Sequence, residues 1–177
     1  MTPDEIERVL DSCPSLQWRL LFALARFAGL RTPSETHGLT WADIDWERGR
    51  MRVRSPKTER HIGHEERLVP VDPRLMPILQ EAFDEAEPGV ERVLTMNHGG
   101  QCHRALQRIV RQAGVDPWDD AFQTLRRSAE MELAMKYPQF AVSKWIGHSI
   151  TVSGRHYANA VPDELFDRAA GVEQRVA

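Results

Sequence analysis

The segment from Ser15 to Gly29 constrains the fold of this chain more than any other part of the sequence. It reads SLQWRLLFALARFAG and is apolar on nearly every side of a helix, so we expect a helix at the centre of the core. Ser15 is a suitable N-cap and Gly29 a suitable stop, which places the predicted helix between Ser15 and Ala28. Arg26 interrupts the apolar run, which is shorter than the roughly 18 residues that a membrane span needs.

Most of the other periodic segments also predict helices. Thr2, Pro3 and Glu5 form a helix start with a capping box, and a short helix is expected after Pro33. Further helices are expected from Asp72 to about Ala86, over RALQRIVRQAG (104–114), from Phe122 to Met135, from Pro138 to about Ile146, and over 151–158 and 162–170.

One region favours extended structure. WADIDWERGRMRVRSP (41–56) predicts two extended segments around a turn at 47–50, and HEERLVPV (64–71) predicts the returning strand of a hairpin whose loop is 56–64. The expected fold class is therefore mainly α with a small antiparallel β-sheet (α+β).

Length and cysteine content bound the organisation of the chain. Its 177 residues fit one domain, with an expected core from about residue 2 to residue 170. Cys13 and Cys102 are too few for a disulfide framework, and the acidic start MTPDEIERVL is not a signal peptide. We therefore expect a cytoplasmic protein without membrane contact.

The charged residues are unevenly distributed along the chain. The net charge is −3, but residues 26–67 and 101–157 together hold 17 basic and 12 acidic side chains, whereas the remaining segments hold 6 and 14. A basic face opposite an acidic back is the arrangement that phosphate binding needs. Ordinary solvated helix faces explain the same distribution and, from charge alone, are the favoured reading.

An ordered set of short motifs carries a family resemblance. GLRTPSE, LTWADID, SPKT, LRRS, WIGHS and RHY occur in this order, and Tyr157 follows His148 by nine residues. Their order and spacing resemble the catalytic domain of the tyrosine recombinases, the phage integrase family, over about Thr2 to Ala170. The resemblance implies site-specific DNA recombination of the kind used in integration by mobile elements. A tyrosine would attack a DNA phosphodiester and leave a 3′-phosphotyrosyl protein and a free 5′-hydroxyl.

That chemistry defines what the protein must supply. The bond energy stays in the covalent link, so no cofactor, ATP or metal is required. Fixed cations aimed at the non-bridging oxygens stabilise the more highly charged transition state. By resemblance, Arg31 and Arg126 are these cations, and Tyr157 is the nucleophile. Tyr137 is the only other tyrosine and lies in no comparable motif, so it serves as a control for experiments on Tyr157. Arg127 points about 100° away from Arg126 on a helix and should not replace it.

Three further residues complete the implied site. His148 resembles the histidine that hydrogen-bonds the scissile phosphate, and Lys57 the hairpin lysine that protonates the departing 5′-oxygen. Gln123 stands where the family usually has histidine, and its amide can donate a hydrogen bond but cannot shuttle a proton. In a second departure, Glu35 follows Arg31 by four residues rather than the usual three. Taken alone, Arg31 reads as the partner of Glu35 in a salt bridge, Lys57 as a turn residue and Tyr157 as a buried aromatic.

A metal site is the competing interpretation of several other side chains. Zinc takes nitrogen and sulfur ligands, but the candidates match no closed four-ligand pattern. They are His61, His64, His98, Cys102 and His103. We predict neither a metal nor a cofactor.

The expected partner is double-stranded DNA, on which the family assembles as a synaptic tetramer. The N-terminal DNA-binding (core-binding) domain of the family is expected to be absent from this chain. The segment VPDELFDRAA (161–170) predicts an amphipathic helix that docks either on its own core or on a neighbouring protomer. Three alternatives stay open: a non-cleaving DNA-binding domain of the same fold, a type IB topoisomerase, and a helical protein-interaction domain.

Overall fold

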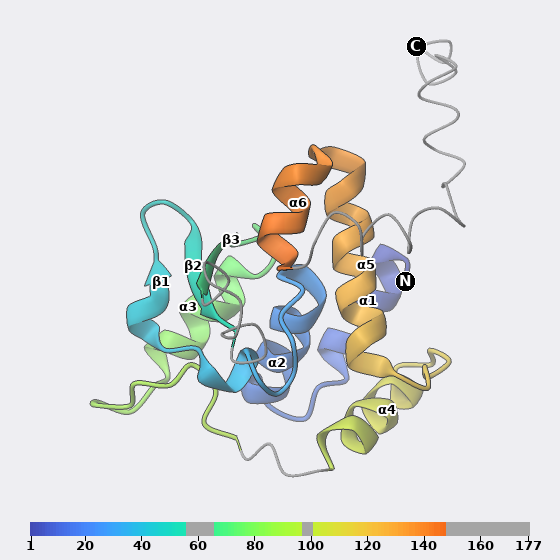
Figure 1. The fold of residues 1–177 in the computed structure, drawn as a ribbon. Helices are drawn as coiled ribbons and strands as arrows, with labels where there is room; N and C mark the ends of the chain where they lie inside the picture. The colour runs from blue at the N-terminus through green and yellow to red at the C-terminus, as the bar shows by residue number, and fades with distance from the viewer. Residues whose placement is uncertain (56–65, 97–100, 148–177) are drawn as a thin grey trace, which may run out of the picture.

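The computed structural model describes residues 1–55, 66–96 and 101–147 (Figure 1). Within these ranges the chain forms helices on several sides of a central helix, with a small sheet to one side. The helices are α1 (Pro3–Asp11), α2 (Leu16–Phe27), α3 (Met76–Asp84), α4 (Cys102–Gln112), α5 (Ala121–Lys136) and α6 (Gln139–Ile146), with 3₁₀ turns at Thr36–Gly38 and Trp41–Asp43. The expected fold class, mainly α with a small antiparallel sheet, is confirmed.

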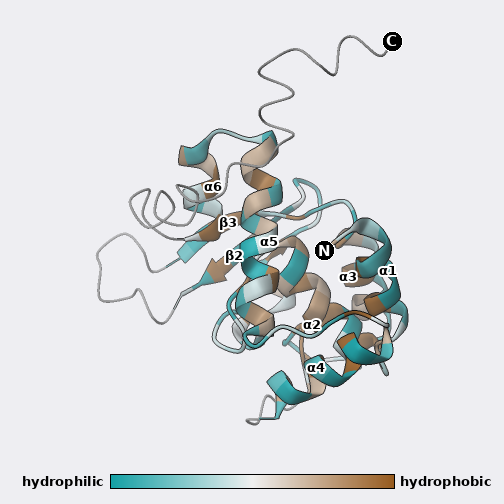
Figure 2. Cartoon of the chain, turned by 90° about the vertical axis from the view of Figure 1, so that its right-hand side faces the viewer, coloured by the Kyte–Doolittle hydropathy of each residue, from teal (hydrophilic) through white to brown (hydrophobic). Residues whose placement is uncertain are grey.

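The predicted central helix is present and buried. Ser15 caps α2 by accepting a hydrogen bond from the main-chain N–H of Trp18, and every residue from Leu20 to Phe27 is buried. The helix packs against α1, α3 and α5, so its apolar circumference meets a neighbour on most sides. By contrast, α4 has one hydrophobic and one hydrophilic side (Figure 2), as the spacing of its apolar residues predicts.

The sheet consists of the two extended segments predicted around the turn at 47–50 and the predicted returning strand. Strands β1 (Ile44–Asp45), β2 (Arg50–Arg54) and β3 (Glu66–Pro70) pair antiparallel in that order. Side chains alternate across β2, so that Met51 and Val53 are buried whereas its three arginines are exposed. Helix α6 packs against β3 and thereby joins the C-terminal helices to the sheet.

Local sequence signals account for most element boundaries. The capping box of Thr2 and Glu5 is present at the start of α1, and the predicted limits of α2, α4, α5 and α6 hold within about two residues. The start of α3 differs from the prediction. Asp72 and Pro73 belong to a turn, and the helix begins only at Met76 because Pro77, which lacks an N–H, fits the first helical turn.

The predicted hairpin loop 56–64 and the predicted helices at 151–158 and 162–170 lie outside the described residues. Among the residues that are described, none of the helices is both long and apolar enough to cross a bilayer.

Candidate functional site

Arg31 lies immediately beyond the end of the central helix. Gly29 ends α2 in the left-handed region, with φ +63°, and a Cβ at this position would lie 2.7 Å from Cδ1 of Ile146. Glycine therefore lets the end of α2 approach the end of α6. The Arg31 guanidinium donates from Nη2 to the carbonyl oxygen of Gly147 at 2.8 Å, which links the two helix ends directly.

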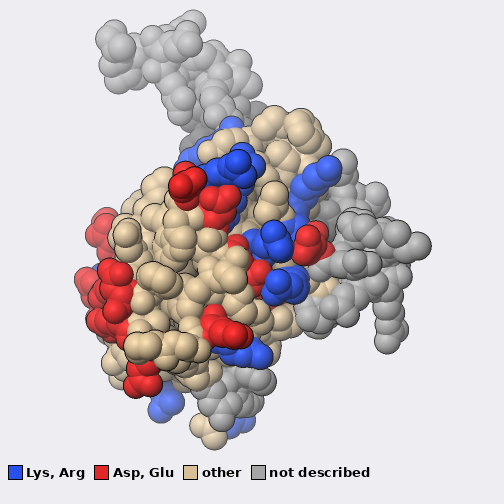
Figure 3. All heavy atoms as spheres, turned by 90° about the vertical axis from the view of Figure 1, so that its left-hand side faces the viewer, with Lys and Arg blue, Asp and Glu red and all other residues tan. Residues whose placement is uncertain are grey.

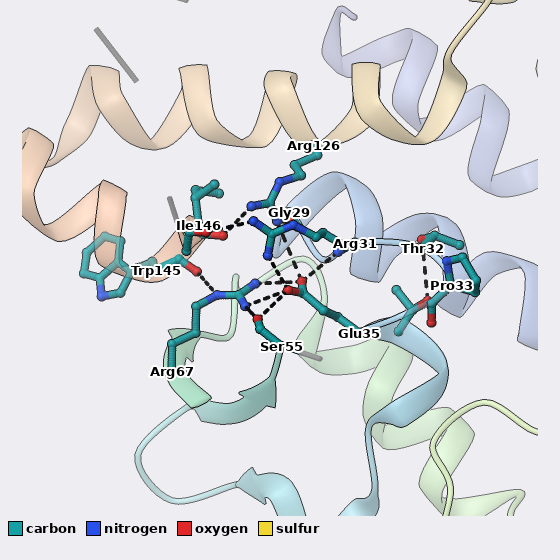
Figure 4. A network of polar contacts seen from close by, with 12 residues as sticks. Gly29, Arg31, Thr32, Pro33, Glu35, Ser55, Arg67, Arg126, Trp145 and Ile146 are labelled. Atoms are coloured by element: carbon teal, nitrogen blue, oxygen red, sulfur yellow. Dashed lines mark hydrogen bonds and ion pairs between the residues drawn. The ribbon is translucent and has the colours of Figure 1, made fainter. Parts of the chain in front are cut away.

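Glu35 is the acceptor at the centre of the site (Figure 4). Its side chain is fully buried and accepts from Nη1 of Arg31 at 2.6 Å and from the main-chain N–H of Arg31 at 2.8 Å. The four-residue spacing permits this contact because the main-chain N–H of Glu35 donates back to the carbonyl of Arg31 at 2.9 Å, which closes a single turn. The salt bridge expected from the sequence is present.

Arg67 reaches the same carboxylate from β3. Its Nη1 and Nη2 donate to the two oxygens of Glu35, each at 2.8 Å, in the two-pronged geometry that a guanidinium makes with a carboxylate. Nη1 also donates to the hydroxyl of Ser55 at 2.6 Å, and Nε donates to the carbonyl of Trp145 at 2.7 Å. The Ser55 hydroxyl donates to Glu35 at 2.7 Å.

Arg126 enters from α5 and is almost fully buried. Its guanidinium donates to the carbonyl oxygens of Gly29 and Ile146, and Nη1 lies 3.7 Å from Glu35. We call the five residues Arg31, Glu35, Ser55, Arg67 and Arg126 the arginine–glutamate cluster. Counted over these five, three guanidinium groups face one carboxylate, so that the cluster carries a charge of +2 when all are ionised.

The charges of the cluster shift two pKa values. Burial alone would raise the pKa of Glu35, but the hydrogen bonds and charges of Arg67 and Arg31 outweigh it and lower that pKa to about 2. Burial, together with the charge of nearby Arg31, lowers the pKa of Arg126 to about 9. Both residues therefore remain predominantly charged at neutral pH. Because Arg31 is the most exposed of the three arginines, at 24%, the cluster presents its positive charge through that side chain.

Two of the predicted catalytic residues meet in this cluster. Arg31 and Arg126 come from different helical regions and converge on Glu35. Arg127 is exposed, whereas Arg126 is buried, which confirms that the two side chains point in different directions. Gln123 is half-buried and lies one turn before Arg126 on α5. Lys57, His148 and Tyr157 lie outside the described residues, so their roles stay predictions.

The sequence interpretation missed Arg67 and Ser55. Arg67 follows once the inward face of β3 is known, because Val69 on the same strand is buried and residues two apart share one face of a strand. Arg67 is thus directed inward, whereas the intervening Leu68 is 54% exposed. An arginine on the buried face of a strand needs acceptors in the interior, which here are Glu35 and a helix-end carbonyl.

The candidate metal ligands are only partly visible. Cys102 and His103 lie at the start of α4, and the other three histidines are outside the described residues. Within the described ranges, no group of three or more potential ligands comes together.

Charge is also segregated on the surface. On the face shown in Figure 3, Asp and Glu side chains gather along the left edge, whereas most Lys and Arg side chains lie towards the upper and right-hand parts. The exposed arginines of β2 are Arg50, Arg52 and Arg54. Arg52 and Arg54 face acidic neighbours at 4.0 Å and 2.9 Å, respectively, so that part of this basic row is neutralised.

The arginine–glutamate cluster lies where two helix ends meet the hairpin. Comparison with known protein families gives a match that covers nearly the whole chain. Residues 1–164 match the model of the phage integrase family, and the chain belongs to that family. It is 25% identical over 205 residues to a XerC-like tyrosine recombinase of Caldanaerobacter subterraneus subsp. tengcongensis. That alignment covers 91% of this chain but 50% of the relative, so the chain spans about half the length of that recombinase.

Solved structures share the fold. The XerA recombinase superimposes with a TM-score of 0.74 at 15% identity, covering 100% of this chain and 65% of the other. The Tn1549 transposon integrase, crystallised in complex with transposon right end DNA, gives a TM-score of 0.72 at 20% identity, covering 100% and 66%. The fold is therefore that of the tyrosine recombinase catalytic domain.

Proposed function

We propose that the protein cleaves and rejoins DNA strands through a 3′-phosphotyrosyl intermediate, as a site-specific recombinase or integrase. The observation that carries the proposal is the arginine–glutamate cluster, in which Arg31 and Arg126 are held together as charged groups. A phosphodiester gains negative charge as it becomes pentacovalent, and preorganised guanidinium groups stabilise that state more than the ground state. Membership of the phage integrase family supports the same chemistry.

In the proposed reaction, the Tyr157 oxygen attacks phosphorus as its proton passes to His148, and the bond to the 5′-oxygen breaks. Lys57 gives its proton to that leaving oxygen, and His148 and Gln123 hydrogen-bond the phosphate. Arg31 and Arg126 contact the non-bridging oxygens. The reverse attack by a 5′-hydroxyl rejoins a strand, so no cofactor is consumed. The substrate is double-stranded DNA, several copies of the protein assemble on it as a synaptic tetramer, and the reaction takes place in the cytoplasm.

Covalent trapping tests the proposal directly. The protein is incubated with nicked duplexes that lose the 5′-hydroxyl strand after cleavage, and a denaturant-resistant protein–DNA adduct is measured. We expect the adduct with the wild type and with Tyr137→Phe, a matched change of the other tyrosine, but not with Tyr157→Phe. An adduct that persists in Tyr157→Phe would contradict the assignment.

Gln123 favours a second candidate, a DNA-binding domain of the same fold that does not cleave. Its side chain stands one turn before Arg126 but cannot transfer a proton at neutral pH. DNA binding without any adduct, at sites where a full-length relative does form one, would support this alternative.

A further inference from the structure

Arg67 lies on β3 and donates hydrogen bonds to three other segments of the chain. Three separate segments of the chain supply its acceptors: the turn after α2 through Glu35, the end of β2 through Ser55, and the last turn of α6 through Trp145. Its Nε, Nη1 and Nη2 all donate to these acceptors, so that four of its five N–H donors are used inside the protein. The contacts of Arg67 therefore lie within the protein.

Each of the three segments leads to a residue of the proposed site. Glu35 holds the guanidinium of Arg31, Ser55 precedes Lys57 by two residues, and Trp145 precedes His148 by three. Gly147 reinforces the last link, because a Cβ there would lie 3.0 Å from Cδ and Nε of Arg67. The guanidinium of Arg67 thus packs directly against Gly147, the residue before His148.

We propose that Arg67 is a positioning residue that holds the segments leading to Arg31, Lys57 and His148 in a fixed relation to one another. A guanidinium suits this role because it is planar and has five N–H donors in a rigid arrangement. Four of these donors make hydrogen bonds here. A lysine keeps the charge but has a single nitrogen, which cannot reach all of these acceptors at once. The inference rests on the proposed function for its effect on catalysis, but the linkage itself can be tested without DNA.

The first measurement is hydrogen–deuterium exchange of wild type and Arg67→Lys. We expect faster exchange in three peptides at once, covering 31–37, 50–55 and 139–147, while α1 and α4 keep the wild-type rate. Arg74→Lys is the matched control, because Arg74 also binds a carboxylate with two prongs, from Nε and Nη2 to Asp72 at 2.9 and 2.7 Å, but makes no contact with the cluster. Faster exchange confined to β3 would overturn the linkage.

The second measurement is single-turnover cleavage of the nicked duplex at saturating DNA. We expect Arg67→Lys to cleave about 100-fold more slowly, the size of effect that a displacement of about 1 Å produces in an active site, with unchanged DNA affinity. Arg74→Lys should cleave at the wild-type rate. A wild-type cleavage rate in Arg67→Lys would overturn the positioning role even if exchange has increased.

The two measurements separate the two proposals. If the wild type forms no adduct, the proposed function fails, and the exchange pattern still decides whether Arg67 joins the three segments. If Arg67→Lys does not fold, Ser55→Ala replaces it, because this change removes the hydroxyl bonded to Arg67 and Glu35 and leaves their ion pair in place. Faster exchange limited to the end of β2 is then expected, and unchanged exchange there would overturn the proposal.

Discussion

The buried carboxylate of Glu35 makes a quantitative prediction about stability. Folding lowers its pKa from 4.5 to about 2, and at about 1.4 kcal/mol for each tenfold change in proton affinity this stabilises the folded protein by about 3 kcal/mol at pH 7. Because the folded pKa is depressed, the contribution is complete above pH 4.5 and is lost as the pH falls towards 2. Glu35→Gln should therefore unfold about 3 kcal/mol more easily at pH 7, with the difference shrinking to about 2 kcal/mol at pH 3.5.

Urea denaturation of both proteins between pH 7 and pH 3.5 measures this difference. Glu81→Gln is the control, since Glu81 pairs with Arg19 at a half-exposed site and its loss should cost less than about 1 kcal/mol. A Glu35→Gln protein as stable as the wild type at pH 7, or a loss that does not change with pH, would refute the reasoning. The first result would mean that the three arginines are stable without their shared acceptor, and the second that the loss does not come from the ionisation of Glu35.

Two smaller predictions concern backbone conformation and thiol reactivity. Gly147→Ala should destabilise the fold by at least about 1–2 kcal/mol in urea denaturation, because Gly147 has φ +79° and the added Cβ meets Arg67; a neutral effect would contradict the packing. Cys13 should react with a disulfide reagent more slowly than Cys102 at pH 8, because burial raises the pKa of Cys13 to about 12 and its thiol donates to the carbonyl of Val9. Burial also raises the pKa of Cys102, but less. The Cys13→Ser protein should therefore retain the faster phase of the reaction, and loss of that phase would mean that Cys13 is the more reactive thiol.

The helices could be predicted because their signals are local. Periodicity and caps located α1, α2, α4, α5 and α6, and among the helices that the structure describes only the start of α3 was wrong. There, two prolines lie four residues apart, at 73 and 77, and both fit the first turn of a helix. Sequence rules do not decide between them, because the choice depends on how the turn packs.

The site could be predicted only in part. Arg31 and Arg126 were found because each lies in a short motif with a defined place in an ordered set. Arg67 was not found because its role depends on the register of β3, which decides whether Arg67 or Leu68 faces inward. The buried state of Glu35 was equally hidden, since it requires three arginines from separate parts of the chain to converge.

The contacts of Arg126 have a consequence for how the family can diverge. An isolated helix leaves its last carbonyl groups without donors, and Arg126 supplies donors to Gly29 beyond α2 and to Ile146 at the end of α6. Replacing this arginine would therefore weaken the fold as well as the proposed chemistry. A descendant that had lost strand cleavage would keep Arg126 for its structural role.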